Sequence, residues 1–147
     1  MELVKLLRSV EMFADLDEDQ LTLLASIFKE RTLKDGEVLF HQGDAGDSMC
    51  LIRSGFVEVV VDAPGESEGR TIVSLGVGQS VGEMTLIDRG TRSASVRAAM
   101  DDTIVAFVSR EDFERLCESR TEIGYRVMRN IAADLSFKLR HRELDVK

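Results

Sequence analysis

The spacing of apolar residues changes twice along the chain, and it predicts helices at both ends with strands between them. Near the N-terminus, Leu21, Leu24 and Phe28 recur at the interval of a helix. Asp17 or Asp19 precedes them as a candidate N-cap. A shorter helix is expected before this one, over residues 3–10. We interpret both as helices that pack on the core.

The middle of the chain has the pattern of short strands. Six segments are rich in β-branched and aromatic residues, namely 37–42, 49–55, 56–62, 70–75, 93–100 and 103–108. Turn signals separate them, and all but one of the 11 glycines lie between Gly36 and Gly90. The only proline, Pro64, is expected at the exposed tip of a hairpin. Short strands with such regular turns predict an antiparallel sandwich or barrel.

After Val108 the helical interval returns. Ser109 is a candidate N-cap for one helix, and Thr121 is a candidate cap for a second, longer helix. Along the second helix, apolar residues recur every four positions, at Val127, Ile131, Leu135 and Leu139. This stripe fits packing on the barrel, and it fits a dimer seam or a movable lid equally well. The sequence leaves these alternatives open.

Composition and charge narrow the class of protein. The 147 residues are 44% hydrophobic and 31% charged, which suits a single domain over residues 1–147. A net charge of -8 disfavours direct binding of nucleic acid. The chain shows no membrane span and no secretory signal, so we expect a cytoplasmic location. Cys50 and Cys117 are expected as reduced thiols, and no Cys/His cluster predicts a metal site.

The residues with candidate chemistry lie between 81 and 98. Gly82 permits a tight turn, and residues 83–86 are expected to form one helical turn whose free N–H groups favour an anion. Arg92 is expected to open the next strand, where its planar guanidinium suits a phosphate, and Ser93 adds a hydroxyl. Glu83 only accepts hydrogen bonds, so it suits a sugar hydroxyl better than a phosphate. Together these groups predict a nucleotide ligand.

The same stretch resembles the phosphate-binding cassette of the cyclic nucleotide-binding domain family. The family pattern is Gly-Glu-apolar-small-Leu, a loop, and then Arg-small-Ala. The matching residues here are Gly82, Glu83, Met84, Thr85 and Leu86, followed by Arg92, Ser93 and Ala94. Thr85 departs from the usual Ala, Ser or Gly, and Thr91 departs from the proline that is common before the arginine.

This resemblance implies a fold of class α+β that is mainly β. It is an antiparallel jelly-roll-like β-barrel over residues 31–108, which includes the cassette at 81–98. Helices precede the barrel in residues 1–30 and follow it in residues 109–147, and a short cassette helix lies within it. The resemblance covers nearly the whole chain.

The resemblance also implies roles for the eight matched residues, which we take as the candidate ligand-binding residues. Arg92 corresponds to the arginine that binds the exocyclic phosphate oxygens. Glu83 corresponds to the glutamate that accepts from the ribose 2′-OH. Backbone N–H groups near Thr85 would complete the phosphate contact. The competing interpretation is an ordinary salt bridge between Arg92 and Glu83 in an empty cassette.

We therefore expect a cyclic nucleotide sensor, with cAMP as the first choice and cGMP as the second. Ser93 discriminates poorly between them. Ligand is expected to draw the cassette inward, and the C-terminal helix from Thr121 onward is expected to close over the base as a lid. Lys138 and Leu139 are expected near the base. The partner is expected to be a protein or a larger regulatory complex, with a homodimer through the C-terminal helix as one form. No cofactor besides the ligand is expected.

Three alternative functions are considered. A DNA-binding regulator of the catabolite activator type would need a helix-turn-helix after the long helix, and we expect none before Lys147. The alternatives left open are the sensor part of a longer protein and a stand-alone sensor that acts on a partner. A cupin-like metal enzyme is disfavoured because His41 and His141 lie in different regions, and we expect no enzymatic activity. The third rival is a scaffold of the same fold whose pocket is unused.

Overall fold

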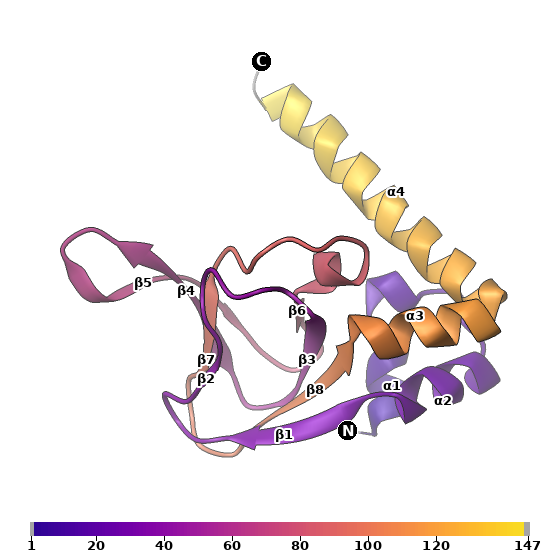
Figure 1. The fold of residues 1–147 in the computed structure, drawn as a ribbon, viewed down its shortest axis with the longest axis horizontal. Helices are drawn as coiled ribbons and strands as arrows, with labels where there is room; N and C mark the ends of the chain where they lie inside the picture. Colours follow the sequence, from indigo (N-terminus) through magenta and orange to yellow (C-terminus); the bar gives the residue numbers. More distant parts are fainter. Residues whose placement is uncertain (1, 146–147) are drawn as a thin grey trace.

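A computed structural model of the chain describes residues 2–145 and places helices at both ends of a pair of β-sheets (Figure 1). The N-terminal part contains helix α1 (Leu3–Arg8), the 3₁₀ turn η1 (Glu11–Phe13) and helix α2 (Glu18–Ser26). Helix α2 starts at one of the two expected caps. The Asp17 carboxylate accepts from the N–H of Gln20 at 2.8 Å, and the Gln20 side chain accepts from the N–H of Asp17 at 2.9 Å. This capping box satisfies two of the N–H groups that a helix start leaves free.

The strands between the helices pair in antiparallel fashion. In chain order they are β1 (Lys29–Leu33), β2 (Val38–Phe40), β3 (Ser48–Ser54), β4 (Val57–Ala63), β5 (Glu66–Leu75), β6 (Ser80–Val81), β7 (Ser95–Ala98) and β8 (Thr103–Ser109). Within residues 2–145 they form two four-stranded sheets, in the orders β1-β8-β3-β6 and β2-β7-β4-β5. The mainly-β jelly roll expected from the sequence is confirmed, in the form of two sheets.

The strand boundaries differ from the expectation at several points. Strand β1 lies outside the predicted strands because its first four residues are exposed and only Leu33 is buried, so no alternation marks it. Strand β5 begins at Glu66 because hairpin pairing with β4 continues as far as Ala63. The turn between them contains Pro64, as the sequence predicts. Strand β7 is shorter than predicted and begins at Ser95.

Two helices follow the last strand. Ser109 caps α3 (Arg110–Ser119), and its hydroxyl accepts from the N–H of Asp112 at 3.1 Å. Helix α4 spans Thr121–Asp145, so Thr121 is its first helical residue and not the cap that the sequence suggested. Figure 1 shows α4 leaving the body of the molecule and extending well beyond it.

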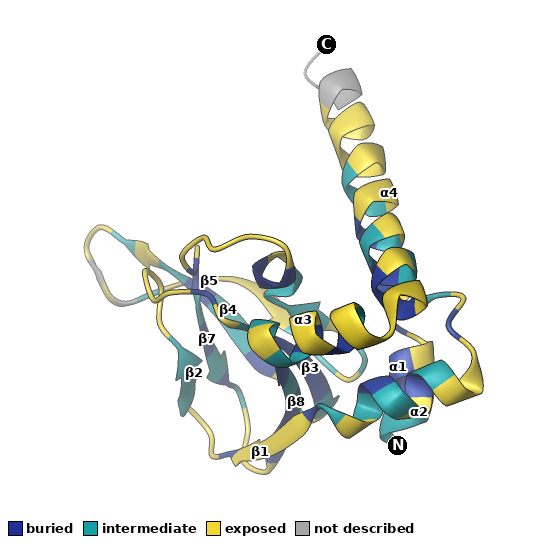
Figure 2. Ribbon diagram, turned by 45° about the vertical axis from the view of Figure 1, so that its right-hand side comes forward, coloured by how far each residue is buried: buried dark blue, intermediate teal, exposed yellow. Residues whose placement is uncertain are grey.

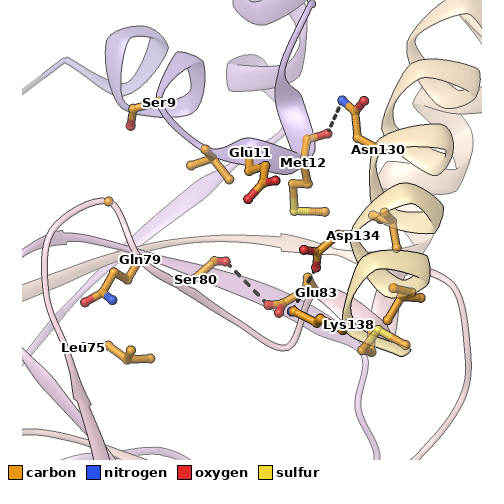
Figure 3. Close-up of a pocket in the computed structure, with 15 residues that line it drawn as sticks. Ser9, Glu11, Met12, Leu75, Gln79, Ser80, Glu83, Asn130, Asp134 and Lys138 are labelled. Atoms are coloured by element: carbon orange, nitrogen blue, oxygen red, sulfur yellow. Dashed lines mark hydrogen bonds and ion pairs between the residues drawn. The ribbon is translucent and has the colours of Figure 1, made fainter. Parts of the chain in front are cut away.

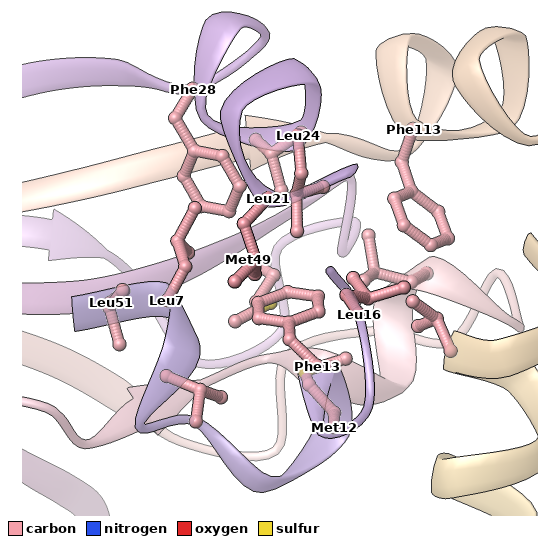
Figure 4. Close-up of a cluster of buried hydrophobic side chains, with 14 of the residues drawn as sticks. Leu7, Met12, Phe13, Leu16, Leu21, Leu24, Phe28, Met49, Leu51 and Phe113 are labelled. Carbon is pink, nitrogen blue, oxygen red and sulfur yellow. The ribbon is translucent and has the colours of Figure 1, made fainter. Parts of the chain in front are cut away.

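The larger buried cluster joins the helices to the first sheet (Figure 4). Phe13 and Phe28 meet edge to face within it, with ring centroids 6.4 Å apart. On α4, Ile123, Val127 and Ile131 are buried in the same cluster, whereas the side chain of Leu139 is 59% exposed. The first part of the apolar stripe therefore packs on the core, and the distal part is uncovered (Figure 2).

Both cysteines are free thiols, as expected. Burial raises the pKa of Cys50 to about 12 and that of Cys117 to about 11, so both stay protonated near neutral pH. None of the helices in residues 2–145 combines the length and apolar character that crossing a membrane requires.

Candidate functional site

The candidate site is built around the tight turn that follows β6. Gly82 has φ of +79°, which is a left-handed conformation that glycine adopts without strain. The short 3₁₀ helix η2 (Glu83–Leu86) starts directly after it. A Cβ atom at position 82 would lie 2.5 Å from Nη1 of Arg92 and 3.0 Å from the Ser48 carbonyl oxygen. Glycine at this position therefore allows both the turn and the close approach of the arginine.

Arg92 is buried, with only 4% of its side chain exposed. It lies in an irregular segment three positions before β7, and not at the start of that strand as the sequence predicted. Contacts from elsewhere in the chain hold it instead. Nη2 donates to the carbonyl oxygen of Ser48 at 2.8 Å, and Cζ lies 3.8 Å from the centroid of the Phe40 ring. Asp47, at 3.9 Å, is a distant and largely exposed counter-ion.

Two nitrogens of this guanidinium have unused donors. Nε and Nη1 of Arg92 are buried and have no hydrogen-bond partner among the described residues. Burial accordingly lowers the pKa of Arg92, because a charge removed from water is destabilised unless it is fully paired. The site thus contains a buried guanidinium, that of Arg92, with two N–H donors that can bind an acceptor on a ligand.

Arg92 and Glu83 line the same cavity, whose volume is about 420 Å³. This size lies within the usual range for small-molecule pockets. Six further cavity-lining residues come from the predicted set or its immediate surroundings: Gly82, Met84, Thr85, Thr91, Ser93 and Ala94. The suggested salt bridge between Arg92 and Glu83 is not among the ion pairs of the described residues, where the neighbour of Arg92 is Asp47.

Glu83 is half-buried and receives a weak hydrogen bond of 3.5 Å from the hydroxyl of Ser80. It also borders a second cavity of about 580 Å³, which lies between the N-terminal helices, the cassette and α4 (Figure 3). Lys138 of α4 lines this cavity and forms a 2.9 Å ion pair with Asp134. The bond to Asp134 raises the pKa of Lys138, and the negative charge of Glu83 acts in the same direction.

The two cavities share Leu75, Ser80, Glu83 and Met84, so Glu83 stands at the boundary between them. Lys138 lines the larger of the two cavities only, and its expected place near the base of the ligand stays a prediction. Leu139 is exposed and does not line either cavity.

Leu86 and Thr85 make contacts within the protein that the sequence did not predict. Leu86 is 2% exposed and belongs to the large hydrophobic cluster, so it anchors the cassette to the core and does not line the cavity. The N–H of Thr85 donates to the carbonyl of Gly82 at 3.0 Å, and its hydroxyl donates to the same carbonyl at 2.7 Å. Both groups are thus engaged within the turn, and the phosphate contact expected from backbone N–H groups near Thr85 stays a prediction.

The branched side chain of Thr85 fits because its neighbour has no side chain. A Cβ atom at Gly46 would lie 2.6 Å from Cγ2 of Thr85. The cassette therefore packs tightly on the loop between β2 and β3, and the departure from a small residue at position 85 does not obstruct the cavity.

Sequence reasoning missed Phe40 and Ser48, which hold Arg92 in place. Val73 is 44% exposed and forms part of the cavity wall, whereas Met49 is fully buried in the core. Among residues 2–145, no group of three His, Cys, Asp or Glu side chains is arranged to hold a metal ion.

Comparison with known proteins gives one consistent result. The family described as the cyclic nucleotide-binding domain matches residues 30–120. The cyclic AMP receptor protein of Thermus thermophilus is 35% identical over 135 residues, which cover 92% of this chain and 60% of that protein. The cGMP-dependent protein kinase egl-4 of Caenorhabditis briggsae is 31% identical over 115 residues, or 78% of this chain and 15% of the kinase. The chain thus spans only part of the length of either relative.

Among solved structures, the N-terminal domain of a transcriptional regulator from Streptomyces coelicolor A3(2) superimposes with a TM-score of 0.84. It is 28% identical, and the match covers 93% of this chain and 94% of that one. The agreement extends over the helices at both ends as well as the sheets.

Proposed function

Because the chain belongs to the cyclic nucleotide-binding domain family, we propose that its cassette cavity binds cAMP, with cGMP as the alternative, and that it acts as a sensor and not as an enzyme. One observation carries the proposal. Arg92 is buried with two unpartnered nitrogens beside a cavity that the Glu83 carboxylate also lines. The two groups require opposite chemistry of a ligand.

The phosphate end of the ligand is assigned to Arg92. A guanidinium binds phosphate oxygens through parallel charge-assisted hydrogen bonds, which are about twice as strong as neutral ones. In the ligand-free protein its Nε and Nη1 lack acceptors, and the phosphate supplies them. Ser93 lines the cavity and adds its hydroxyl.

The sugar end is assigned to Glu83. A carboxylate repels a phosphate but accepts well from a hydroxyl, and the cyclised nucleotide leaves the ribose 2′-OH free. Ser80 holds the carboxylate only weakly, at 3.5 Å, so the hydroxyl competes easily for it. Apolar walls from Val73 and Leu75 complete a surface for the purine.

The choice of cAMP over cGMP follows from the relatives that the chain matches. The relative from Thermus thermophilus carries the name of a cyclic AMP receptor, at higher identity than the cGMP-dependent kinase. Ser93 has a hydroxyl that serves either base. Lys138, which donates hydrogen bonds but accepts none, faces the neighbouring cavity and is the α4 side chain that a base would meet.

Signalling is assigned to movement of the helices against the sheets. Nδ2 of Asn130 donates to the carbonyls of Met12 and Ala14 at 3.1 and 2.9 Å, so α4 is tied to the N-terminal segment up to that point. A lid that begins at Thr121 therefore has to carry η1 with it, or else only the part beyond Ile131 moves. Ligand drives either change only by binding the two states differently.

The output is assigned to a protein partner or to a second copy of the chain. Beyond Ile131 the side chains of Phe137 and Leu139 are each 59% exposed, which supports a dimer seam along distal α4. The net charge of -8 supports a partner other than nucleic acid. We propose a cytoplasmic location for the same module.

Calorimetric titration with cAMP and cGMP tests the proposal, with 5′-AMP as the control for an uncyclised phosphate. We expect cAMP to bind most tightly. Glu83→Gln, whose amide oxygen still accepts, should weaken binding by about tenfold. Arg92→Met should weaken it by about a hundredfold or more.

Arg115→Met is the matched control, because Arg115 lies on the exposed face of α3 and pairs only with Glu111 and Asp112 among the described residues. Tighter binding of cGMP reverses the choice of base. A lack of heat with both nucleotides leaves the chain as a scaffold with an unused cavity.

A further inference from the structure

Arg110, the first residue of α3, reaches back to the underside of the cassette. Its Nη1 lies within hydrogen-bond distance of three backbone carbonyls. These belong to Gly46 at 2.8 Å, Asp88 at 3.1 Å and Thr85 at 3.3 Å. Two of these carbonyls come from the cassette and one from the loop between β2 and β3. One side chain thus connects three segments that are distant in the sequence.

The chemistry of the Arg110 side chain favours stable hydrogen bonds to these carbonyls. A guanidinium stays charged at any physiological pH, and the carbonyls at the end of a helical turn lack partners within it. Nη1 carries two protons for three acceptors, so at least one proton is shared. The backbone N–H of Arg110 also donates to the carbonyl of Asp47 at 2.8 Å, which fixes the same loop from the main chain.

The loop held by Arg110 is the one that positions the phosphate-binding arginine. Ser48, which accepts from Arg92, follows directly after Asp47. The N–H of Arg92 donates to the carbonyl of Asp44 at 2.7 Å, and the N–H of Gly46 donates to the carbonyl of Gly90 at 3.1 Å. Several hydrogen bonds thus connect the loop between β2 and β3, the cassette and the start of α3.

The attachment continues into α4. A Cβ atom at Gly124 would lie 2.8 Å from Cβ of Cys117, so α3 and α4 pack with almost no space between their backbones at this point. A displacement of the start of α3 therefore reaches α4 through tightly packed atoms and not through a loose linker.

We propose that Arg110 is a positioning residue that makes the cassette, the loop before β3 and α3 move as one body. The part of this inference that concerns signalling rests on the proposed nucleotide binding: cassette movement on binding would be carried through Arg110 to α3 and α4. Arg110 does not line the cassette cavity. Its role is to connect the binding step to the helices.

Hydrogen exchange measured by mass spectrometry tests the inference on Arg110→Met, which keeps the bulk of the side chain but removes its donors. Arg115→Met, a change of the same kind on the same helix, is the control. Without nucleotide, amides in residues 43–47 and 82–90 should exchange about tenfold faster in Arg110→Met only. Arg110→Lys, which keeps a charge and fewer donors, should restore part of the protection and serves if Arg110→Met does not fold.

The second arm uses saturating cAMP and cGMP. In the wild-type protein, nucleotide should slow exchange in the cassette and in α3; in Arg110→Met the cassette should respond while α3 does not. A purely structural role would lower stability but leave both responses intact, and that result overturns the inference. Unchanged exchange in the ligand-free arm overturns it as well. If the wild-type protein ignores both nucleotides, the proposed function fails, and the ligand-free arm still decides whether Arg110 joins the three segments.

Discussion

Arg92 lies over the face of Phe40, with its guanidinium carbon 3.8 Å from the ring centroid. The aromatic face stabilises the cation where water has been excluded, but it accepts no hydrogen bond in the ring plane. The ring therefore leaves the buried donors on Nε and Nη1 without an acceptor. The ligand-free protein maintains an incompletely solvated charge, which makes the arginine ready to bind an anion.

Replacing Arg92 should abolish nucleotide binding without lowering the free energy of unfolding. A buried charge that lacks partners is destabilising, and apolar replacements of buried ionic groups are often neutral or stabilising. We expect Arg92→Met to leave the free energy of unfolding within about 1 kcal/mol of the wild-type value or to raise it. Nucleotide affinity should be lost in the same variant. Urea denaturation of the ligand-free protein checks the first expectation, and a loss of stability above about 2 kcal/mol would contradict it.

Gly82 is expected to be intolerant of any side chain. Gly82→Ala places a residue at φ of +79° and drives its Cβ to 2.5 Å from Nη1 of Arg92. The chain offers a matched control in Gly36, which has φ of +80° and open space around it. Both alanine variants should lose about 1 kcal/mol from backbone strain. Only Gly82→Ala should lose more than that and also lose nucleotide affinity, as measured by thermal unfolding and calorimetry; equal effects in the two variants would show that contact with Arg92 is unimportant.

Asn130 is expected to matter more than its position near the middle of α4 suggests. Its amide nitrogen donates to two carbonyls of the N-terminal segment, which lose their partner in Asn130→Ala. We expect a loss of about 1–3 kcal/mol in the free energy of unfolding. Ser136→Ala, an exposed change on the same helix, should be neutral. Asn130→Asp should be no better than the alanine variant, because a carboxylate cannot donate to the carbonyls.

The contribution of Glu58 to the free energy of unfolding should depend on pH. Its carboxylate accepts from the Thr71 hydroxyl at 2.9 Å and pairs with Arg97 at 3.2 Å, and these contacts, that of Thr71 first, lower its pKa. A lowered pKa in the folded state means that the stabilisation is complete above the ordinary value of about 4.3 and is lost as pH falls through the folded value. The difference in unfolding free energy between wild type and Glu58→Gln should be constant from about pH 6 to 8 and should shrink below about pH 4. A difference that grew on acidification would have the wrong sign.

The sequence predicted the cassette well because its chemistry is local. Glu83 and Arg92 lie on either side of one turn, so their types and spacing alone indicate a shared cavity. The groups that hold Arg92 could not be found in this way. Ser48 is 44 residues away in the chain, and its carbonyl oxygen carries no signal of residue type. Leu86 could not be placed either. An apolar side chain is equally suitable for a cavity wall and for the core, and only the packing shows that Leu86 belongs to the core.

The strands were predictable where β-branched and aromatic residues cluster and less so where they do not. Strand β8 is rich in such residues and was anticipated closely, whereas β1 exposes four of its five residues and has no such cluster. The apolar stripe on α4 predicted the helix but not which surface the stripe packs against. The buried and the exposed parts of the stripe are both apolar and differ only in what lies opposite them in the fold, which a single sequence does not show.

Gly46 and Thr85 meet across the junction of cassette and loop, where a single added carbon atom at position 46 would collide with the threonine methyl group. The two positions therefore behave as a pair whose combined volume is limited. The carbonyl oxygen of Gly90, 3.0 Å from the same Cβ position, limits the space further and does not depend on residue 85. A side chain at position 46 therefore requires a smaller residue than threonine at position 85 and a small shift of the Gly90 backbone, whereas shortening Thr85 alone requires neither.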